Sequence, residues 1–358
     1  MKVVSIVGAR PQFIKAAPVC RALRERHVEV LIHTGQHYDY AMSEVFFEEL
    51  GIPAPDFNLE VGSGPHGEQT GAMLALIERL LLDESPDCVL VYGDTNTTLA
   101  GALAAAKLNI PVAHVEAGLR SFDRTMPEEV NRVVTDHLSD VLLCPTAASV
   151  SNLLAEGITH GVELVGDVML DTARFQAERP SGPVLSAFGV ESGAYYLATV
   201  HRAANSDSPE RLSAIVDAFV ALERPVVWLV HPRTAKNLAA FGLEERIVAA
   251  GEVLAVPPVS YGVTVALLRG AAGLLTDSGG MQKEAYFLGV PCVTLREQTE
   301  WVETVEAGWN TLAGTDTARI VAAARSLRRP DTRPEVYGDG HAAAKVVAAI
   351  ERHLGQRS

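Results

Sequence analysis

Residues 88–118 read CVLVYGDTNTTLAGALAAAKLNIPVAHVEAG and decide the fold class. Two short apolar runs, Cys88–Tyr92 and Val112–Val115, flank a segment that the spacing of apolar residues predicts as a helix over Thr97–Leu108. Both runs are continuously apolar rather than alternating, as strands buried on both faces should be. A strand, a helix and a second strand in this order are the repeating unit of a parallel, doubly wound sheet.

The same rhythm extends along the chain. The other strands predicted in the first half are Val3–Val7, Val30–His33 and Val141–Cys144. The other helices predicted there are Gln12–Arg26, Ala41–Leu50, Glu68–Leu82, Glu128–Leu138 and Ala147–Glu156. Strands are then predicted at Val162–Val165, Tyr195–Val200, Val226–Val230, Val253–Val256, Leu274–Thr276 and Cys292–Leu295. The pattern predicts an α/β protein throughout.

The length of 358 residues is about right for two α/β domains. We place the domain change near Gly166–Asp167, which gives domains over 1–166 and 167–339. The Pro- and Gly-rich stretch Glu178–Val184 is interpreted as a linker or loop. A last helix is predicted at His341–Leu354, and the pattern leaves open which domain it packs against.

Charge and composition exclude several classes of protein. The formal net charge of −14 argues against sequence-independent binding to nucleic acid, which needs an extended basic face. No stretch approaches the roughly 20 apolar residues that cross a bilayer, and the apolar run before Gly8 is too short for a signal peptide. The 4 cysteines form no CxxC pair. We therefore expect a cytoplasmic protein that acts neither on a membrane nor on nucleic acid.

Ligands of open parallel sheets bind beyond the carboxyl ends of the strands, so the residues that follow each strand matter most. After the first strand comes Gly8, with Arg10 and Lys15 at the start of the next helix. A glycine turn, a helix N-terminus and two cations favour an anion. The stretch matches neither GxGxxG nor a P-loop, and an ordinary turn with a solvent-facing arginine is the alternative interpretation.

Three acidic residues are expected at the same edge of the first sheet: Asp94, Glu116 and Glu128. Each has a plainer interpretation, because Asp94 is a typical helix N-cap and Glu128 lies in the first turn of a helix, after Pro127. His114 and Glu116 form an HxE pair, but the PCxxC segment of zinc deaminases is absent, so we expect no metal. Carboxylates that share a site raise one another's pKa, which suits acid–base chemistry near neutral pH.

The second domain supplies cations and phosphate-binding backbone. His201 and Arg202 follow one predicted strand, and His231 and Arg233 follow the next. The segment Ser278-Gly279-Gly280 leads from a strand into a helix and predicts a nest of backbone N–H donors for a phosphate. Glu284, about one turn into that helix, is placed to accept hydrogen bonds from the two hydroxyls of a ribose. Either histidine alone is more often a structural imidazole.

The segments GARPQFIK, YGDT, HVEAGLRSFDRTMPEEVNR, HRAAN, HPR and TDSGGMQKEA together resemble the non-hydrolysing UDP-N-acetylglucosamine 2-epimerase family. The resemblance implies a glycosyltransferase-B-like fold of two Rossmann-like domains, with the active site in the interdomain cleft. It also implies that the C-terminal helix, within 340–358, joins the first domain. The implied substrate is a UDP-sugar, with no metal or redox cofactor, and the implied assembly is a homodimer.

The resemblance also assigns roles. In this family UDP-GlcNAc and UDP-ManNAc interconvert by removal of the C2 proton, loss of UDP to give 2-acetamidoglucal, and re-addition. The catalytic positions correspond to Asp94, Glu116, Glu128 and His201. The positions corresponding to UDP contacts are Arg10, Lys15, His201, Arg202, His231, Arg233, Ser278, Gly279, Gly280 and Glu284. The implied biological role is the supply of precursors for cell-envelope polysaccharide.

Some positions depart from the family's usual pattern. The usual HRREN reads His201–Asn205 as HRAAN, and the usual TERPE reads Thr299–Glu303 as TEWVE. The segment from Gly35 to Ser43 lacks the glutamines that bind an activating second UDP-GlcNAc in several bacterial members, and Glu68 replaces an expected arginine. The segments TEWVE, QKEA and GQHYD resemble a branch that epimerises UDP-2,3-diacetamido-glucuronate. A glycosyltransferase and an inactive sugar-nucleotide sensor are the alternatives from other classes.

Overall fold

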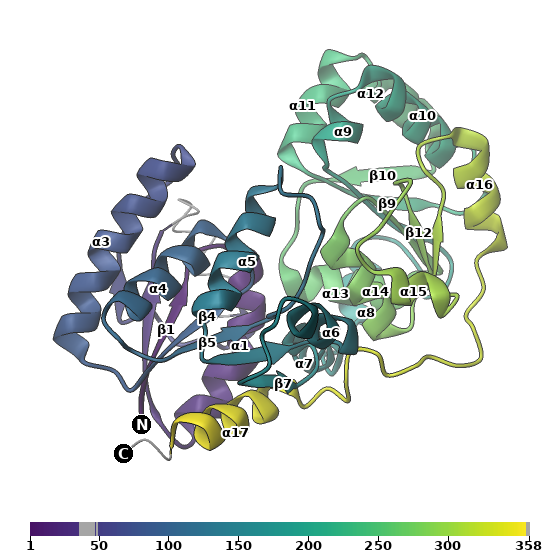
Figure 1. Ribbon diagram of the computed structural model, residues 1–358. Coiled ribbons are helices and arrows are strands. Elements are labelled where there is room, and N and C mark those ends of the chain that lie inside the picture. Colours follow the sequence, from purple (N-terminus) through teal and green to yellow (C-terminus); the bar gives the residue numbers. More distant parts are fainter. Residues whose placement is uncertain (36–46, 48, 356–358) are drawn as a thin grey trace. The chain divides into compact units, whose positions relative to one another are not determined.

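The computed structural model describes residues 1–35, 47 and 49–355, so the predicted helix Ala41–Leu50 and the segment after Gly35 lie largely outside the described residues. The chain forms two compact units, Met1–Thr172 with Glu335–Ser358 (unit 1) and Ala173–Pro334 (unit 2) (Figure 1). The division falls after Thr172 rather than after Gly166. One reason is Asp171, whose carboxylate accepts hydrogen bonds from the backbone N–H groups of Ala342 and Ala343.

Unit 1 is built on a sheet of parallel strands. The described strands are β1 Lys2–Val7, β2 Val28–His33, β3 Phe57–Asn58, β4 Cys88–Tyr92, β5 Val112–Val115, β6 Val141–Cys144 and β7 Val162–Leu164. Their order in the sheet is β3-β2-β1-β4-β5-β6-β7. The order reverses direction after β1, so the helices that follow β1 and β4 cover opposite faces, as right-handed crossovers require.

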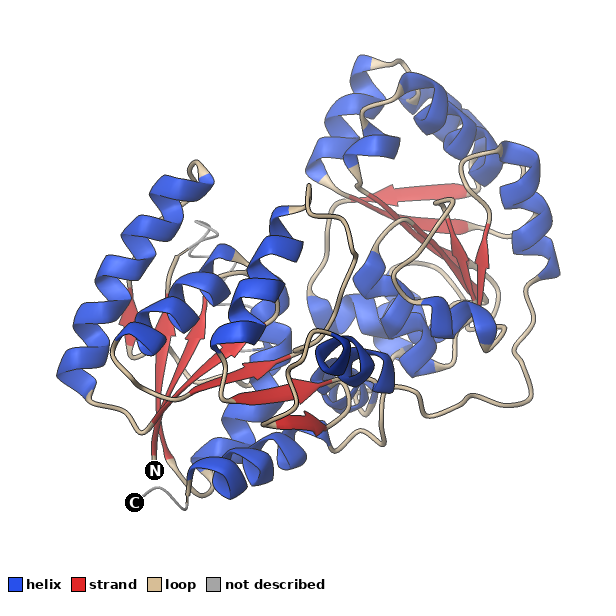
Figure 2. Ribbon diagram, viewed as in Figure 1, coloured by secondary structure: helices blue, strands red, loops and turns tan. Residues whose placement is uncertain are grey.

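The helices of unit 1 form a layer on each face of the sheet (Figures 1 and 2). One layer contains α3 His66–Glu84, α4 Asn96–Lys107 and α5 Pro127–Leu138. On the other face α1 Arg10–Arg24 packs beside the C-terminal α17 Ala342–Leu354. The remaining helices are α6 Ala147–Ala155 and α7 Val168–Ala177, and α7 spans the division between the units.

Unit 2 repeats the architecture with a second parallel sheet in the order β10-β9-β8-β11-β12-β13. The described strands are β8 Tyr196–Val200, β9 Val226–Val230, β10 Val253–Val256, β11 Gly273–Thr276, β12 Cys292–Thr294 and β13 Asn310–Leu312. The described helices are α8 Gly182–Ala187, α9 Ala203–Ser206, α10 Pro209–Val220, α11 Pro232–Ala240, α12 Glu244–Ala250, α13 Tyr261–Gly270, α14 Gly279–Leu288, α15 Val302–Glu306 and α16 Thr317–Ser326. Two parallel α/β sheets were expected, and that expectation is confirmed.

The strand register brings the carboxyl ends of neighbouring strands to one edge of each sheet. In unit 1, Tyr92 of β4 pairs with Val115 of β5, so Asp94 and Glu116 follow strand ends that lie side by side. In unit 2, Thr199 of β8 pairs with Thr276 of β11, and their hydroxyls are 2.6 Å apart. The loops that contain the predicted functional residues therefore lie at the carboxyl edge of each sheet.

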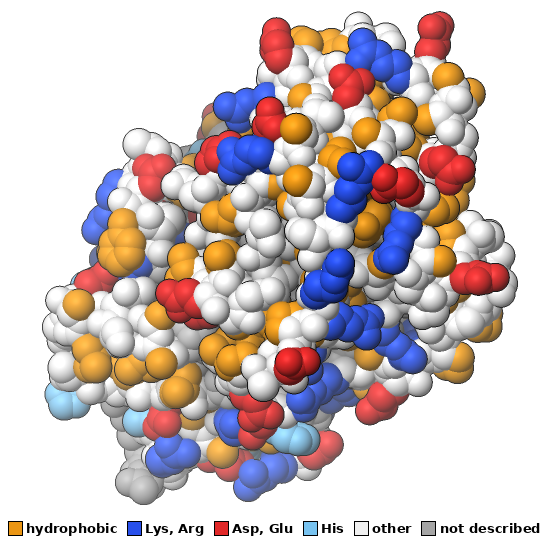
Figure 3. Space-filling model, turned by 90° about the vertical axis from the view of Figure 1, so that its right-hand side faces the viewer, with side chains coloured by type: hydrophobic (Ala, Val, Ile, Leu, Met, Phe, Trp, Pro, Cys, Tyr) orange, Lys and Arg blue, Asp and Glu red, His pale blue; other side chains and the backbone are white. Residues whose placement is uncertain are grey.

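Charged side chains of both signs lie on the surface, and the cysteines lie in the interior. Figure 3 shows basic and acidic side chains interspersed over one face. All four cysteines are buried and carry free thiols. Within the described residues, no helix combines the length and the apolar character needed to span a bilayer.

Candidate active site

Glu116 lies at the carboxyl edge of unit 1, directly after β5, and forms an ion pair with Lys15 of α1. Only 8% of Glu116 and 7% of Lys15 is exposed, so the pair is largely shielded from water. Glycine is required at position 93, because φ is +64° there and a Cβ atom would lie 2.9 Å from Lys15 Nζ and 3.4 Å from Glu116 Oε2. The backbone at Gly93 therefore closely approaches a carboxylate and an ammonium group.

Asp94 is held by α5. Arg132 NH2 lies 2.5 Å from Asp94 Oδ2, and Asn131 Nδ2 donates to the Asp94 carbonyl at 2.9 Å. The sequence led us to expect carboxylates that repel one another. Instead, the chain provides a cation for each of Asp94 and Glu116, so attraction to a fixed positive charge dominates their surroundings.

The neighbouring residues Glu128 and Glu129, which open α5, have different environments. Glu129 is buried, and its carboxylate accepts hydrogen bonds from Ser121 N, Ser121 Oγ, Phe122 N and Arg132. Burial alone would raise the pKa of Glu129, but these hydrogen bonds hold it below its usual value. Glu128 is exposed at the same helix start. Glu129 is therefore structural, which leaves Glu128 available to a ligand.

The turn after β1 differs from the expected phosphate site. The Gln12 side chain accepts hydrogen bonds from the backbone N–H groups of Gly8 (2.8 Å) and Ala9 (3.0 Å). Two donors that the sequence offered to a ligand are thus already used. Lys15 pairs with Glu116, and Arg10 is the first residue of α1.

Asp277 organises the carboxyl edge of unit 2. It is fully buried, and its carboxylate accepts hydrogen bonds from His201 N at 3.0 Å, Arg202 N at 3.0 Å and Asn205 Nδ2 at 3.1 Å. Its carbonyl also accepts from Arg202 Nε at 3.1 Å. One carboxylate after β11 therefore fixes the backbone and side chains that follow β8.

His201 has a lowered pKa. Burial is the main cause, and the cations Arg202 and Arg233 add to it while Asp277 opposes it. The ring of His231 lies 5.7 Å from that of His201, centroid to centroid. His231 also caps α11 by accepting a hydrogen bond from Arg233 N at 3.2 Å. The structure brings these predicted residues together around a largely neutral imidazole.

The segment Ser278-Gly279-Gly280 opens α14, and Ser278 is its N-cap. A Cβ atom at Gly279 would lie 3.2 Å from Trp301 Nε1 and 3.9 Å from Arg202 NH2. The Glu300 carboxylate (Oε2, 3.6 Å) lies near the same position, and Gly280 has open space beside it. The start of this helix is where the sequence predicts an anion site. Glu284 lies one turn further along α14 and is buried.

A cavity of about 270 Å³ lies beside Arg202, near the predicted anion site. Its lining includes Arg202, Arg211 and Arg296, and Glu300 pairs with Arg296 (2.9 Å, twice) and with Arg202 (3.4 Å). Burial favours protonation of Glu300, but the hydrogen bonds from Arg296 hold its pKa below the usual value. Arg202 lines the cavity and also lies near the Cβ position of Gly279, so the cavity and the predicted anion site share this residue.

Sequence reasoning missed several of these residues. Arg132, Asp277 and Glu300 all lie within the quoted or compared motifs, yet their roles depend on partners far away in the chain. His114, considered above as a metal ligand, binds Asp136 and the Gly93 carbonyl instead. Among the described residues, no three or more His, Cys, Asp or Glu side chains are grouped to hold a metal ion.

Two doubly wound units built on parallel sheets define a glycosyltransferase-B-like α/β protein. The model of the family described as UDP-N-acetylglucosamine 2-epimerase matches residues 21–351. The chain belongs to this family.

Similar proteins cover essentially the whole chain. A UDP-2,3-diacetamido-2,3-dideoxy-D-glucuronate 2-epimerase of Pseudomonas aeruginosa is 48% identical over 98% of this chain and 100% of its own. The crystal structure of the Methanocaldococcus jannaschii UDP-GlcNAc 2-epimerase in complex with UDP-GlcNAc and UDP has a TM-score of 0.87 at 44% identity, covering 98% of this chain and 100% of that one. The Neisseria meningitidis UDP-GlcNAc 2-epimerase bound to UDP-GlcNAc has a TM-score of 0.89 at 30% identity, with the same coverage.

Proposed function

We propose that this chain interconverts UDP-N-acetylglucosamine and UDP-N-acetylmannosamine by inverting carbon 2 without hydrolysis. The observation that carries the proposal is the set of three carboxylates at one sheet edge, each in its own environment. Glu116 pairs with Lys15, Asp94 pairs with Arg132, and Glu128 is exposed. Inversion needs separate groups on the two faces of the sugar, and this edge supplies them.

The proposed reaction balances without any cofactor. A carboxylate takes the C2 proton, and the electrons of the C2–H bond form the C1–C2 double bond. The C1–O bond breaks at the same time, and its electron pair leaves on the diphosphate oxygen of UDP. The product, 2-acetamidoglucal, then regains the UDP oxygen at C1 and a proton at C2 on the opposite face. The departing diphosphate needs preorganised donors, which the start of α14, Arg202 and His201 are proposed to provide.

In this proposal UDP is bound by both units. Arg10 and Lys15 come from unit 1, and the other groups proposed to contact UDP are His201, Arg202, His231, Arg233, Ser278, Gly279, Gly280 and Glu284 of unit 2. Relatives solved with UDP-GlcNAc support the choice of ligand. His201 has a second role as a catalytic group, since a neutral imidazole beside the diphosphate can accept a proton as negative charge arrives.

A second candidate substrate is UDP-2,3-diacetamido-2,3-dideoxy-D-glucuronate, with the same chemistry. The arginine-lined cavity beside the anion site favours it, because guanidinium groups bind a carboxylate such as the one at C5 of a uronate. Arg211 makes no ion pair within the described residues, so its guanidinium group is proposed to bind the carboxylate of the uronate. The 48% identical Pseudomonas aeruginosa relative is named for this substrate.

Parallel assays with both substrates separate the candidates. ¹H NMR of the anomeric region reports the manno epimer as it forms, and the substrate with the higher kcat/KM identifies the physiological class. Arg211→Ala should raise KM for the uronate by about tenfold, which corresponds to roughly 1.4 kcal/mol, and leave KM for UDP-GlcNAc unchanged. Transfer of the sugar to an acceptor with no epimer formed would favour a glycosyltransferase instead.

We further propose a cytoplasmic homodimer that supplies precursors of cell-envelope polysaccharide. Four free, buried thiols support a reducing compartment. The family resemblance supports the dimer. Light scattering coupled to gel filtration measures the mass directly, and a value near that of a single 38.2 kDa chain would contradict the dimer.

A further inference from the structure

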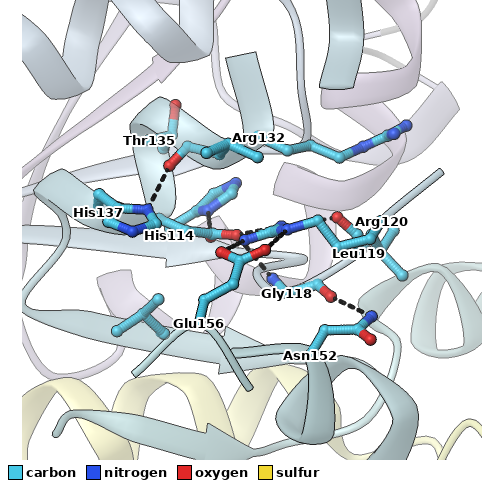
Figure 4. Close-up of polar contacts among 12 residues, drawn as sticks. His114, Gly118, Leu119, Arg120, Arg132, Thr135, His137, Asn152 and Glu156 are labelled. Atoms are coloured by element: carbon cyan, nitrogen blue, oxygen red, sulfur yellow. Dashed lines mark hydrogen bonds and ion pairs between the residues drawn. The ribbon is translucent and has the colours of Figure 1, made fainter. Parts of the chain in front are cut away.

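His114 is a fully buried residue of β5 that links two other elements. Its Nδ1 lies 2.7 Å from Asp136 Oδ1 of α5, and its Nε2 lies 2.7 Å from the Gly93 carbonyl after β4. The proposed reaction does not use the ring. Its hydrogen-bond partners are nevertheless close to the proposed catalytic residues in the chain: Gly93 directly precedes Asp94, and Gly118, which binds Asp136, follows Glu116 by two residues. Figure 4 shows the surrounding polar contacts.

Both partners of the ring are hydrogen-bond acceptors. A backbone carbonyl can only accept. Asp136 accepts from every neighbour, since its Oδ2 receives hydrogen bonds from Gly118 N at 3.1 Å and Arg120 NH1 at 2.6 Å. Burial raises the pKa of Asp136, but the hydrogen bonds from His114 and the charge of Arg120 hold it below its usual value. Each ring nitrogen of His114 therefore faces a hydrogen-bond acceptor, and a ring with a proton on both nitrogens, an imidazolium, satisfies both acceptors.

The cluster balances this charge. Arg120, whose side chain is 1% exposed, also binds Glu156 through Nε (2.7 Å) and NH2 (2.8 Å). In Figure 4 Arg120 lies along the carboxylate of Glu156, and Asn152 donates to the Gly118 carbonyl at 3.0 Å. Two cations, His114 and Arg120, thus face two anions, Asp136 and Glu156. A buried cation that is paired in this way does not carry the cost of an isolated charge.

The network connects the turns that carry two proposed catalytic carboxylates. Arg132 and Asp136 lie one turn apart on the same face of α5. Arg132 binds the Asp94 side chain, whereas Asp136 holds the preceding residue, Gly93, through His114. Asp136 also binds Gly118 N, two residues after Glu116. Removing the ring would release one side of the Asp94 turn while the Glu116 turn stayed attached to α5.

We propose that His114, with a proton on each ring nitrogen, is a positioning residue that fixes the Asp94 turn relative to Glu116. This inference rests on the proposed epimerase function. His114 does not contact the substrate; it acts through the Gly93 carbonyl, and the reacting carboxylates keep their separation because both turns are tied to Asp136. Misplacement of reacting groups by about 1 Å can lower a rate on the order of 10²-fold.

His114→Gln tests the role, because a glutamine cannot donate from two nitrogens to both acceptors. We expect kcat for epimerisation to fall about tenfold or more, while the Kd for UDP, measured by calorimetry, stays within about twofold. The fraction of 2-acetamidoglucal released should rise, since reprotonation then lags behind elimination. The matched control is His137→Gln: His137 is exposed, one residue after Asp136, and its ring hydrogen-bonds its own helix at Val133 O (2.9 Å).

Unchanged kcat and glycal release in a folded His114→Gln protein would overturn the positioning role. The wild-type protein provides a second test that needs no variant. In ¹⁵N-histidine NMR at neutral pH, His114 should show protons on both ring nitrogens, and one unprotonated nitrogen would overturn the inference whatever the activity. Wild-type protein with no C2 chemistry on either UDP-sugar would instead overturn the proposed function.

Discussion

Glu116 has both an unfavourable backbone conformation and a buried carboxylate. Its φ is +74°, in the left-handed region that side chains other than glycine rarely adopt, and its carboxylate is 8% exposed. Strain of this kind costs on the order of 1–3 kcal/mol and persists where the surroundings hold the residue firmly. Here the strand before it, the Lys15 ion pair and the Gly118 turn after it do so. Such strain concentrates at reactive residues, which agrees with the proposed acid–base role.

The carboxylates can be tested one at a time. Asp94→Asn, Glu116→Gln and Glu128→Gln should each lower kcat by about 10² or more, the scale of a lost acid–base group. Steady-state kinetics with the preferred UDP-sugar measure the loss. Glu78→Gln, on the exposed face of α3, is a control that removes a carboxylate without chemical consequence.

Binding and turnover should separate between the two units. UDP affinity should be nearly unchanged in the three carboxylate variants, whereas Glu284→Ala on α14 should weaken UDP binding in calorimetry. If the carboxylate variants lose UDP affinity rather than turnover, the assignment of chemistry to unit 1 is wrong.

His201 should report the arrival of the diphosphate. Its pKa lies below the usual histidine value of about 6.5, because burial and two arginines disfavour the charged ring. Addition of UDP brings negative charge and should raise that pKa, which a ¹H–¹⁵N NMR titration measures with and without UDP. Equal titration curves would place the diphosphate elsewhere.

The same shift has a consequence for folding. The unfolded chain protonates this histidine at a higher pH than the folded chain does. The free energy of unfolding therefore decreases as the pH falls through the pKa that His201 has in the unfolded chain. The loss is complete once the pH is below the pKa that His201 has in the folded chain.

At the scale of elements, the turns after β5 and α6 each contain a glycine with nearly the same left-handed backbone conformation. Gly118 has φ +78° and a Cβ there would lie 2.4 Å from Ser149 O, whereas Gly157 has φ +81° with nothing within 4 Å. Gly157→Ala should cost about 1–2 kcal/mol of unfolding free energy, the price of the backbone conformation alone. Gly118→Ala should cost clearly more, because α6 must move. Urea unfolding measures both, and equal losses would contradict the clash.

Elements with long buried runs were predictable, and short or unpatterned ones were not. Cys88–Tyr92 and Val112–Val115 have the predicted bounds because burial on both faces leaves a continuous apolar signature. The strands β3 and β13, two and three residues long, are too short to show any pattern. The prediction of a loop over Glu178–Val184 was partly wrong: α8 begins at Gly182, with Pro183 in its first turn, where proline is tolerated.

The candidate site was predictable as a set of positions but not as a set of contacts. Strand ends located Asp94, Glu116 and His201, since parallel strands deliver their following loops to one edge. The partner of each was not predictable, because Lys15 and Glu116 are 101 residues apart and pair only once α1 packs beside β4. The cations that neutralise the carboxylates therefore emerged only from the structure.

At the scale of the whole molecule, each unit has its own core. The apolar side chains around Trp228 and Phe219 belong to unit 2, and those around Ile6 and Ile77 belong to unit 1. The chain passes from unit 1 to unit 2 after Thr172 and returns before Glu335, so that α17 packs against α1. Proposed acid–base groups lie on one unit and most proposed UDP contacts on the other. The proposed reaction therefore uses residues of both units.

The central claim is that this chain breaks and remakes the C2–H bond of a UDP-2-acetamido sugar. The most direct measurement is incubation of the protein with UDP-GlcNAc, and separately with the diacetamido uronate, in D₂O, followed by ¹H NMR and mass spectrometry. We expect deuterium at C2 together with the C2 epimer, and loss of both in Glu116→Gln. Recovery of both sugars with C2 still fully protonated would contradict it.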